Sequence, residues 1–470
     1  MNTNSRSRWP IAVAALTLGI VACTCGGLGN AAPTPTPASP PTPTPPPAEI
    51  AAPTKPPIIG EGTGGGGGLS IINAVAAPRS DGGWRLMGEV ANNSDSAASS
   101  LSLNIEWFDS SGASLGSDTG YILTTNVAPG ESSPFLYNIY DAGVPVASFA
   151  AEVTEFTTLQ DLSRASFDIE HAVLTVDEFG DFHCTGELVN NGSVSASLEG
   201  LAAAIVDSSG ALVSADSYWA VARHLEPGAR TPFRISPLGF SGAAASAYSC
   251  SVYVDAVTAD PIGLSPVAFV DTNGDGDNGN DILFYIDAFG SSHLVGEITN
   301  NGSEPMAVQL IAGLYNANGE TIDADFASAP IALDPGQTLP FDFTTLSAIN
   351  YNEALRGEVS RFFVLIDPFW TFPTFTQQVQ LQPQNGSASN DNGTVVETVD
   401  IFNDQTFNVD YAYVLVKVTD ASGQVVGYSF TSTDPITAGA SVSASVTLYV
   451  DPALDPSTLT VTVTAYALKP

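Results

Sequence analysis

The strongest constraint on the fold is a short phrase that the chain repeats three times. The copies begin at Gly88, Gly186 and Gly296 and read Gly-Glu-Val-Ala-Asn-Asn-Ser, Gly-Glu-Leu-Val-Asn-Asn-Gly-Ser and Gly-Glu-Ile-Thr-Asn-Asn-Gly-Ser. An apolar segment closed by Asn-Asn predicts a strand that ends in a tight turn, because Asn and Gly tolerate the left-handed backbone. Recurrence at domain-length spacing predicts one module used several times.

Two turn motifs follow each copy of the phrase at nearly constant distances. A hairpin turn begins at Asp109 after Gly88, at Asp207 after Gly186 and at Asn316 after Gly296. A Pro-Gly turn follows in each copy with the same regularity, at Pro129, Pro227 and Pro335. Segments such as 101–107 alternate apolar and polar residues, as half-buried strands do. Turns at these intervals predict sandwiches of about seven strands.

A divergent fourth copy completes the chain. Val399 stands in place of the phrase glycine, and Asp420 and Ala438-Gly439 stand for the two turns at matching distances. The predicted fold class is therefore all-β. We expect tandem Ig-like antiparallel β-sandwich domains over residues 69–160, 161–262, 263–372 and 373–470.

The motifs of the first copy resemble those of a known domain family. The phrase, the Trp-Phe-Asp-x-x-Gly hairpin at 107–112 and the Pro-Gly-Glu-Ser turn at 129–132 are similar to FxLYD-type domains. The resemblance is best from Gly88 to Phe135 and weaker in the later copies. Such domains are small β-sandwiches of bacterial and archaeal envelope proteins, usually assigned no catalytic activity. The resemblance implies an architecture and an envelope location, and it carries over no site residues.

Residues 1–22 have the features of a secretory signal peptide. Arg6 and Arg8 give a positive start, and residues 11–22 form an apolar run. This run is shorter than the ~20 residues of a membrane-spanning helix. It ends in Ile-Val-Ala-Cys, which resembles a bacterial lipobox and implies cleavage after Ala22 and lipidation of Cys23. An ordinary signal peptide cut near Ala32 and an uncleaved anchor are the alternatives.

Residues 23–68 form the predicted tether. Residues 31–57 are mostly Pro, Thr and Ala. Proline fixes φ and removes amide donors, so this stretch favours an extended polyproline II spacer. Gly64 to Gly68 add a flexible end. We expect an extracytoplasmic protein, lipid-anchored at the cell membrane, whose domains lie away from the lipid.

Composition and motifs argue against several classes of function. Acidic residues outnumber basic ones 49 to 13, which gives a formal net charge of -36. A surface of this charge repels phosphate backbones, so we expect no nucleic-acid partner. The four histidines are scattered, and the sequence has no Gly-x-Ser-x-Gly, Walker or His-Glu-x-x-His motif. We therefore expect a protein that is not an enzyme and requires no cofactor.

Cys184 and Cys250 both fall in the second predicted domain. One precedes the phrase glycine, and the other lies on the predicted last strand of that domain. In an exported chain such a pair predicts a disulfide across the sandwich. Two separate buried thiols are the alternative.

The acidic segment 271–281 is a candidate calcium site. It begins Asp-x-Asn-x-Asp-Gly, as an EF-hand loop does, so that oxygen ligands alternate along the chain. The twelfth position is Ile282 instead of a bidentate Glu, and no helices are predicted around the loop. A solitary calcium loop would use Asp271, Asn273, Asp275, Asp277 and Asp281. A solvated acidic linker is the alternative.

Two functions are consistent with these features. The first is a non-enzymatic, membrane-anchored surface lipoprotein that displays tandem modules for adhesion, interaction or envelope structure. The second is an extracellular protein that binds a glycan or a calcium-dependent partner. A glycan site would use exposed aromatic rings, for which the candidates are Trp219, Phe369, Trp370 and Phe372. Buried rings would favour the first function.

Overall fold

The computed structural model describes residues 58–59, 61–62, 67–79, 82–140, 143–217, 221–239, 243–272, 281–374 and 377–469. All of them belong to one compact unit, residues 50–470, which is distinct from residues 1–49. Among the described residues the α-helices are two short segments, α1 (Ser347–Asn350) and α2 (Glu353–Arg356). The prediction of an all-β chain of antiparallel sandwiches is confirmed.

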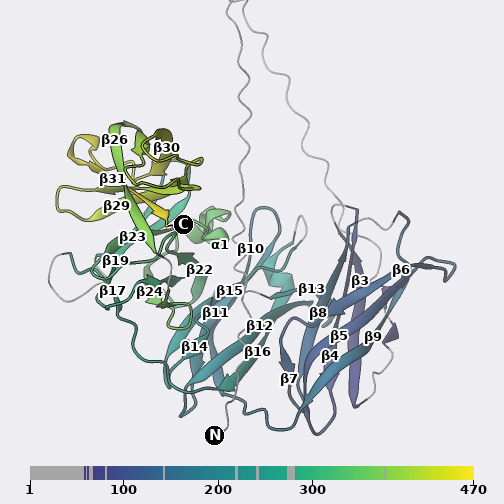
Figure 1. Ribbon diagram of the computed structural model, residues 1–470. Helices are drawn as coiled ribbons and strands as arrows, with labels where there is room; N and C mark the ends of the chain where they lie inside the picture. The colour runs from purple at the N-terminus through teal and green to yellow at the C-terminus, as the bar shows by residue number, and fades with distance from the viewer. Residues whose placement is uncertain are drawn as a thin grey trace, which may run out of the picture. The chain divides into compact units, whose positions relative to one another are not determined.

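Module 1 consists of two sheets (Figure 1). The first contains, in spatial order, β1 (Ile58–Ile59), β3 (Leu69–Pro78), β4 (Trp84–Asn92) and β8 (Ser132–Ile139). The second contains β2 (Glu61–Gly62), β9 (Ser148–Leu159), β5 (Ala97–Phe108) and β6 (Ser114–Tyr121), and β7 (Asn126–Val127) pairs with β5. The pairing of β2 with β9 is parallel. The longer strands pair antiparallel.

Module 2 repeats this plan. One sheet contains β10 (Phe167–Val176), β11 (Phe182–Asn190) and β15 (Arg230–Ile235). The other contains β13 (Leu212–Ser217), β12 (Ala196–Asp207), β14 (His224–Leu225) and β16 (Tyr248–Thr258), the last paired with β12. A single 3-10 turn, Ala245–Ala247, precedes β16.

Module 3 has the same two main sheets and a small extra pair. The first sheet contains β17 (Val267–Phe269), β19 (Ser292–Asn300), β18 (Leu283–Ile286) and β23 (Thr338–Phe343). The second contains β22 (Thr321–Ser328), β21 (Gln309–Tyr315) and β24 (Arg361–Ile366). The extra pair is β20 (Met306–Ala307) with β25 (Phe372–Pro373).

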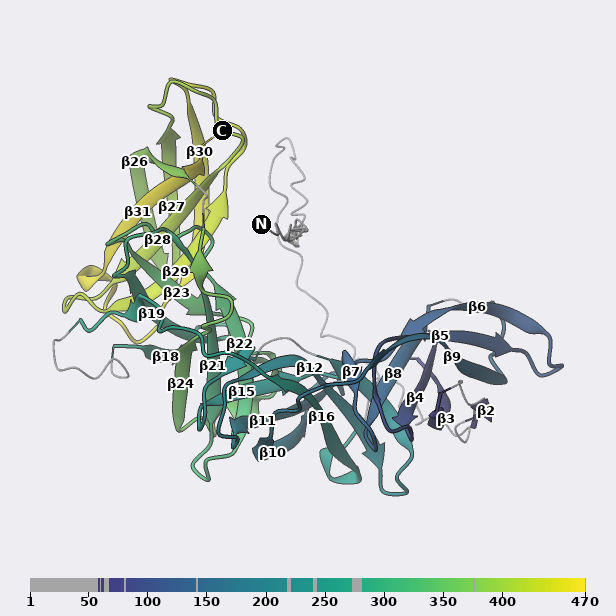
Figure 2. The same ribbon diagram turned by 60° about the horizontal axis from the view of Figure 1, so that its bottom comes forward.

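Module 4 is a single six-stranded sheet that folds onto itself (Figure 2). Its order is β29 (Val425–Ser432), β28 (Ala412–Thr419), β31 (Thr460–Leu468), β26 (Gln378–Asp391), β27 (Thr394–Phe402) and β30 (Ser441–Tyr449). Strand β26 belongs to both halves, because its first four residues pair with β31 and the rest of its pairing is with β27. A 3-10 turn, Pro456–Thr458, precedes β31.

Each module has a core cluster, and that of module 3 continues into module 4. Among the described residues, modules 1 and 4 contain clusters of 18 and 17 buried residues, and module 2 a cluster of nine. The cluster of module 3 contains 18 of its own buried residues together with Leu415 and Tyr428 of module 4. Module 2 is the one that carries the pair Cys184 and Cys250. The structure joins these cysteines as a disulfide between β11 and β16, with Cα atoms 6.2 Å apart. The bridge therefore links the two sheets around the smallest of the four cores.

The phrase glycine is required by a phenylalanine on the neighbouring strand. Gly88 lies opposite Phe135, Gly186 opposite Phe233, and Gly296 opposite Phe341. A Cβ atom on any of these glycines would lie 2.7–2.8 Å from the ring, a distance that real contacts do not reach. In module 4 the pair is Val399 and Ala444. The divergent fourth copy thus replaces the glycine and phenylalanine with valine and alanine, both of which are buried in the core of module 4.

The first asparagine that closes the phrase ties the strand end to the next turns. Asn92, Asn190, Asn300 and Asn403 are fully buried. Each side-chain amide donates to two backbone carbonyls, one just beyond the phrase and one far along the chain at the start of the later turn. Its carbonyl accepts the backbone N–H two residues later. Module 4 keeps this network although its phrase is otherwise changed.

Candidate functional site: the junctions between modules

The glutamate of the repeated phrase faces away from the core of its own module. Side chains alternate along a strand, so the glycine that packs on phenylalanine points inward and the next residue points outward. These residues, Glu89, Glu187 and Glu297, are here called the phrase glutamates. Glu89 and Glu187 are nevertheless buried, with 8% and 2% of their surface exposed. What buries them is the following module.

At the first junction, Glu89 interacts with module 2. Its two oxygens accept hydrogen bonds from the side chains of Asn73 (2.8 Å) and Ser132 (2.7 Å) within module 1. Tyr253 of β16 also bonds to it, and burial of the phenol together with this carboxylate raises the pKa of Tyr253. Beside them Met87 is fully buried in an apolar cluster with Ala204, Leu212 and Ala215 of module 2.

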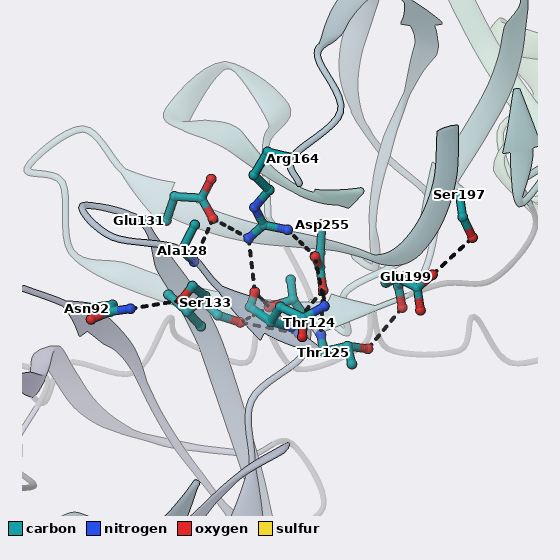
Figure 3. Close-up of polar contacts among 12 residues, drawn as sticks. Asn92, Thr124, Thr125, Ala128, Glu131, Ser133, Arg164, Ser197, Glu199 and Asp255 are labelled. Atoms are coloured by element: carbon teal, nitrogen blue, oxygen red, sulfur yellow. Dashed lines mark hydrogen bonds and ion pairs between the residues drawn. The ribbon is translucent and has the colours of Figure 1, made fainter. Parts of the chain in front are cut away.

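A second polar cluster at the first junction centres on Asp255 (Figure 3). This carboxylate is 1% exposed and accepts the backbone N–H groups of Thr125 (3.0 Å) and Asn126 (2.6 Å) from module 1. Arg164 forms an ion pair with Asp255 and another with Glu131 of module 1. The cluster holds a buried charge that is both paired and hydrogen-bonded, the condition under which burial of a charge is tolerated.

At the second junction, Glu187 receives two donors. The hydroxyl of Tyr315, from β21 of module 3, donates to one oxygen over 2.6 Å, and Arg230 lies 3.0 Å from the other. Burial, together with the bond to Glu187, raises the pKa of Tyr315. Nearby, Arg234 of module 2 forms a buried ion pair with Asp323 of module 3.

At the third junction, Glu297 pairs with Lys417 of module 4, with 2.8 Å between Nζ and Oε1. The hydroxyl of Tyr285 donates to the backbone carbonyl of Tyr449 over 2.8 Å. Val295, which is fully buried, packs with Val425 of β29. Each phrase glutamate therefore accepts a hydrogen bond from the module that follows it.

These junctions share one construction. In each, the outer face of the strand that carries the phrase (β4, β11 or β19) packs on the next module. The strand of that module which contacts the phrase glutamate is β16, β21 or β28, respectively. The sequence shows the recurring outward glutamate, but its partners are Tyr253, Tyr315 and Lys417, which occupy different positions in their modules. Sequence reasoning missed these contacts for that reason. The available clue was a charged residue repeated within an otherwise apolar strand.

The predicted site residues have different outcomes. The disulfide partners Cys184 and Cys250 are joined, as described above. Cys23 and the tether up to residue 57 lie outside the described residues. So do Asn273, Asp275 and Asp277 of the candidate calcium loop. Of its two described ends, Asp271 and Asp281, the second is 7% exposed, and its Oδ2 has no hydrogen-bond partner among the described residues.

The candidate aromatic residues do not form a flat platform. Phe369, Trp370 and Phe372 are 36–45% exposed. The rings of Phe369 and Trp370 lie edge to face, 5.3 Å apart with 82° between their planes. The guanidinium of Arg223 lies 5.6 Å from the Trp370 ring. Trp219 lies outside the described residues. A sugar ring stacks on the flat face of an aromatic ring. Because these two rings are nearly perpendicular, a sugar could stack on only one of them.

One group of side chains has the spacing of metal ligands. Atoms of Glu170, His171 and Glu187 lie within 4.8 Å of one another. Arg230, however, lies 3.7 Å from Glu170 and 3.0 Å from Glu187. The guanidinium already supplies the positive charge that an ion would bring.

Comparisons with known proteins give little guidance. No protein-family model matches the chain, and no curated protein matches it. Among solved structures, a β-glucuronidase from glycoside hydrolase family 2 is 11% identical over 36% of this chain and 21% of that chain, with a TM-score of 0.12. A mutant Salmonella alpha-2-macroglobulin (10% identity, 85% and 29% coverage, TM-score 0.13) and E. coli alpha-2-macroglobulin (10%, 84% and 28%, 0.12) are similarly distant. The chain spans less than a third of each of these proteins, and scores this low support no argument.

No helix in the described part of the chain is long and apolar enough to cross a membrane.

Proposed function

We propose that this chain is a non-enzymatic, membrane-anchored surface lipoprotein that displays tandem β-sandwich modules for adhesion, interaction or envelope structure. The observation that carries the proposal is the repeated junction, in which each phrase glutamate accepts a hydrogen bond from the next module. Modules within one chain move relative to one another unless their interface is substantial. A carboxylate that accepts a hydrogen bond at each of three successive junctions holds the modules in a fixed spatial arrangement, which suits a display protein.

The sequence supplies the second part of this proposal. The lipobox-like Cys23 and the Pro-rich tether fit a protein held at the membrane with its modules at a distance. The resemblance to FxLYD-type domains fits an envelope location. Several acyl chains on one cysteine anchor a protein stably to a membrane, whereas a single acyl chain binds only weakly and reversibly.

Replacement of Cys23 tests the anchor. We expect Cys23→Ala to move the full-length protein from the membrane fraction to the medium, because no acyl chain is added. Cys25→Ala is the matched control and should stay with the membrane. Fractionation followed by immunoblotting measures both. Retention of Cys23→Ala in the membrane fraction would refute the lipoprotein proposal.

One observation favours a second function, that of a calcium-dependent binding protein. Asp281 ends the acidic segment with a buried carboxylate oxygen that no described residue satisfies. A buried acceptor without a partner costs about 1–3 kcal/mol, so a ligand that satisfied this oxygen would stabilise the loop. A cation held by Asp271, Asn273, Asp275, Asp277 and Asp281 would provide one.

Calcium titration of the full-length protein tests this alternative. At about 100 times the dissociation constant, binding raises the free energy of unfolding by ~2.7 kcal/mol. We expect calorimetric heat and a rise in the melting temperature with Ca²⁺, and loss of both in Asp281→Asn. Asp391→Asn, at the exposed end of β26 in module 4, is the control. Absence of heat at millimolar Ca²⁺ would remove the site.

A further inference from the structure

The third junction contains a histidine between two carboxylates. His293, on the outer face of β19, lies with Nδ1 2.8 Å from Asp342 Oδ2 and Nε2 3.3 Å from Asp287 Oδ2. The three side chains are 2–4% exposed. All three belong to module 3, but module 4 covers them.

The contacts of His293 with two carboxylates are both satisfied when the ring carries two protons. A neutral imidazole donates from one nitrogen only, and its other nitrogen would then direct a lone pair at a carboxylate. The imidazolium donates to both. Burial lowers the pKa of His293, but the hydrogen bonds and charges of Asp342 and Asp287 outweigh it, so that the pKa lies above its ordinary value of 6.5. Burial also raises the pKa of Asp342.

Module 4 closes over this cluster through aromatic rings. Tyr285 stacks on the His293 ring, with centroids 4.9 Å apart and 6° between the planes. Its hydroxyl donates to the carbonyl of Tyr449 in module 4. The Tyr449 ring lies 5.4 Å from Phe289 and 6.2 Å from His293. The cluster is therefore kept from water by the docking of module 4.

We propose that the docking of module 4 on module 3 is pH-dependent, with protonated His293 holding the junction and loss of its proton loosening it. This inference rests on the proposed function, since it concerns the regulation of one of the same junctions. When the ring loses its proton, the buried carboxylates of Asp287 and Asp342 lose their shared cation. Undocking of module 4 then exposes them to water and relieves the cost.

The other charged and titratable groups around His293 do not compensate for this loss. From module 4, Asp451 adds a further negative charge, and burial together with Asp342, Asp287 and Asp451 raises the pKa of Tyr285. Burial and the charge of Asp342 likewise raise the pKa of Tyr428. Tyr449 contributes an uncharged ring. Of the nearby cations, Lys417 is paired with Glu297, and Arg356 lies beside Gly290 in the turn that follows Asp287.

The direction of the effect follows from the charge that docking buries. With Asp287 and Asp342 ionised, the three side chains carry one net negative charge when His293 is protonated and two when it is neutral, and burial costs more for the higher charge. Docking therefore raises the pKa at which the cluster loses its proton, so the stabilisation is complete below the pKa of the undocked cluster and is lost as pH rises through the pKa of the docked one. Rising pH thus weakens the junction.

The second junction provides a natural control. His183 occupies the same position three residues before the phrase glycine. Its ring nitrogens lie 3.0 Å from the hydroxyl of Ser236 and 3.2 Å from Asp177. A hydroxyl either donates or accepts, so this ring is satisfied when neutral. His183 carries one carboxylate where His293 carries two.

A distance measurement across the third junction tests the proposal. The full-length chain, with Cys23→Ser and Cys25→Ser to remove competing thiols, receives spin labels at the exposed positions Ser303→Cys and Ser445→Cys. We expect one narrow distance distribution near pH 6. At higher pH we expect a second population, in which module 4 is undocked. Between low and high pH, the ratio of undocked to docked molecules should grow about tenfold for each unit by which docking raises the pKa of the His293 cluster.

Two variants identify the group responsible. His293→Gln should abolish the pH response, and His183→Gln should keep it. An unchanged distribution in the unsubstituted chain up to about pH 9, or an equal response in His293→Gln, would overturn the proposal. A broad distance distribution at every pH would instead contradict the proposed function, because the modules would then have no fixed spatial arrangement.

Discussion

Replacement of Asp255 by alanine is expected to lower the free energy of unfolding by about 3 kcal/mol, because it removes one partner of a buried ion pair. The carboxylate satisfies the backbone N–H groups of Thr125 and Asn126 as well as the Arg164 guanidinium (Figure 3). In the variant the backbone N–H groups of Thr125 and Asn126 lose this acceptor, and Asn126 is buried. The loss is expected at the low end of the roughly 3–5 kcal/mol range for broken buried pairs, because Glu131 still neutralises Arg164.

Urea unfolding with matched variants measures this effect. Asp255→Asn keeps one acceptor oxygen and should lose less stability than Asp255→Ala. Asp260→Ala, at an exposed position just after β16, should stay within about 0.5 kcal/mol of the unsubstituted protein. If Asp255→Ala and Asp260→Ala gave equal stabilities, the first junction would not depend on this cluster.

The fold was predictable from the sequence because its determinants are local and repeated. The hairpin turns begin with Asp109, Asp207, Asn316 and Asp420, whose side chains accept backbone N–H groups two and four residues later. These contacts can be predicted from neighbouring residues alone, without knowing which strands pair. The exchange of Gly and Phe for Val399 and Ala444 was hidden, because the two positions are far apart in the chain and meet only in the sheet.

The junctions were not predictable in the same way. Arg164 is an ordinary basic residue in the sequence, and only the packing of module 2 on module 1 brings it to Glu131 and Asp255. Docking partners of the phrase glutamates change from Tyr to Lys, because a carboxylate accepts a hydrogen bond equally well from a phenol or an ammonium. Because several residue types can serve as the donor, the partner position has no fixed sequence motif. The outward glutamate recurs, and its partner does not.

Removal of the disulfide between Cys184 and Cys250 is the second change with a large expected effect. The bridge closes a loop of 66 residues, so it lowers the entropy of the unfolded chain, by an amount worth about 4 kcal/mol. Module 2 needs this contribution more than its neighbours, because its core cluster contains nine buried residues, whereas modules 1 and 3 each contribute 18 to theirs. A small core removes little apolar surface from water, and small domains usually gain the missing stability from a covalent link such as a disulfide.

The double variant Cys184→Ala, Cys250→Ala should therefore fold to the same β structure and unfold more easily in module 2. Far-UV circular dichroism should be unchanged, because modules 1, 3 and 4 build the same sandwich without such a bridge. Calorimetry should show one transition shifted to lower temperature, and reduction of the unsubstituted protein should reproduce the shift. If reductant left every transition in place, module 2 would not depend on the bridge. Its small core would then be supported by the junctions on either side, through Asp255 and Arg234.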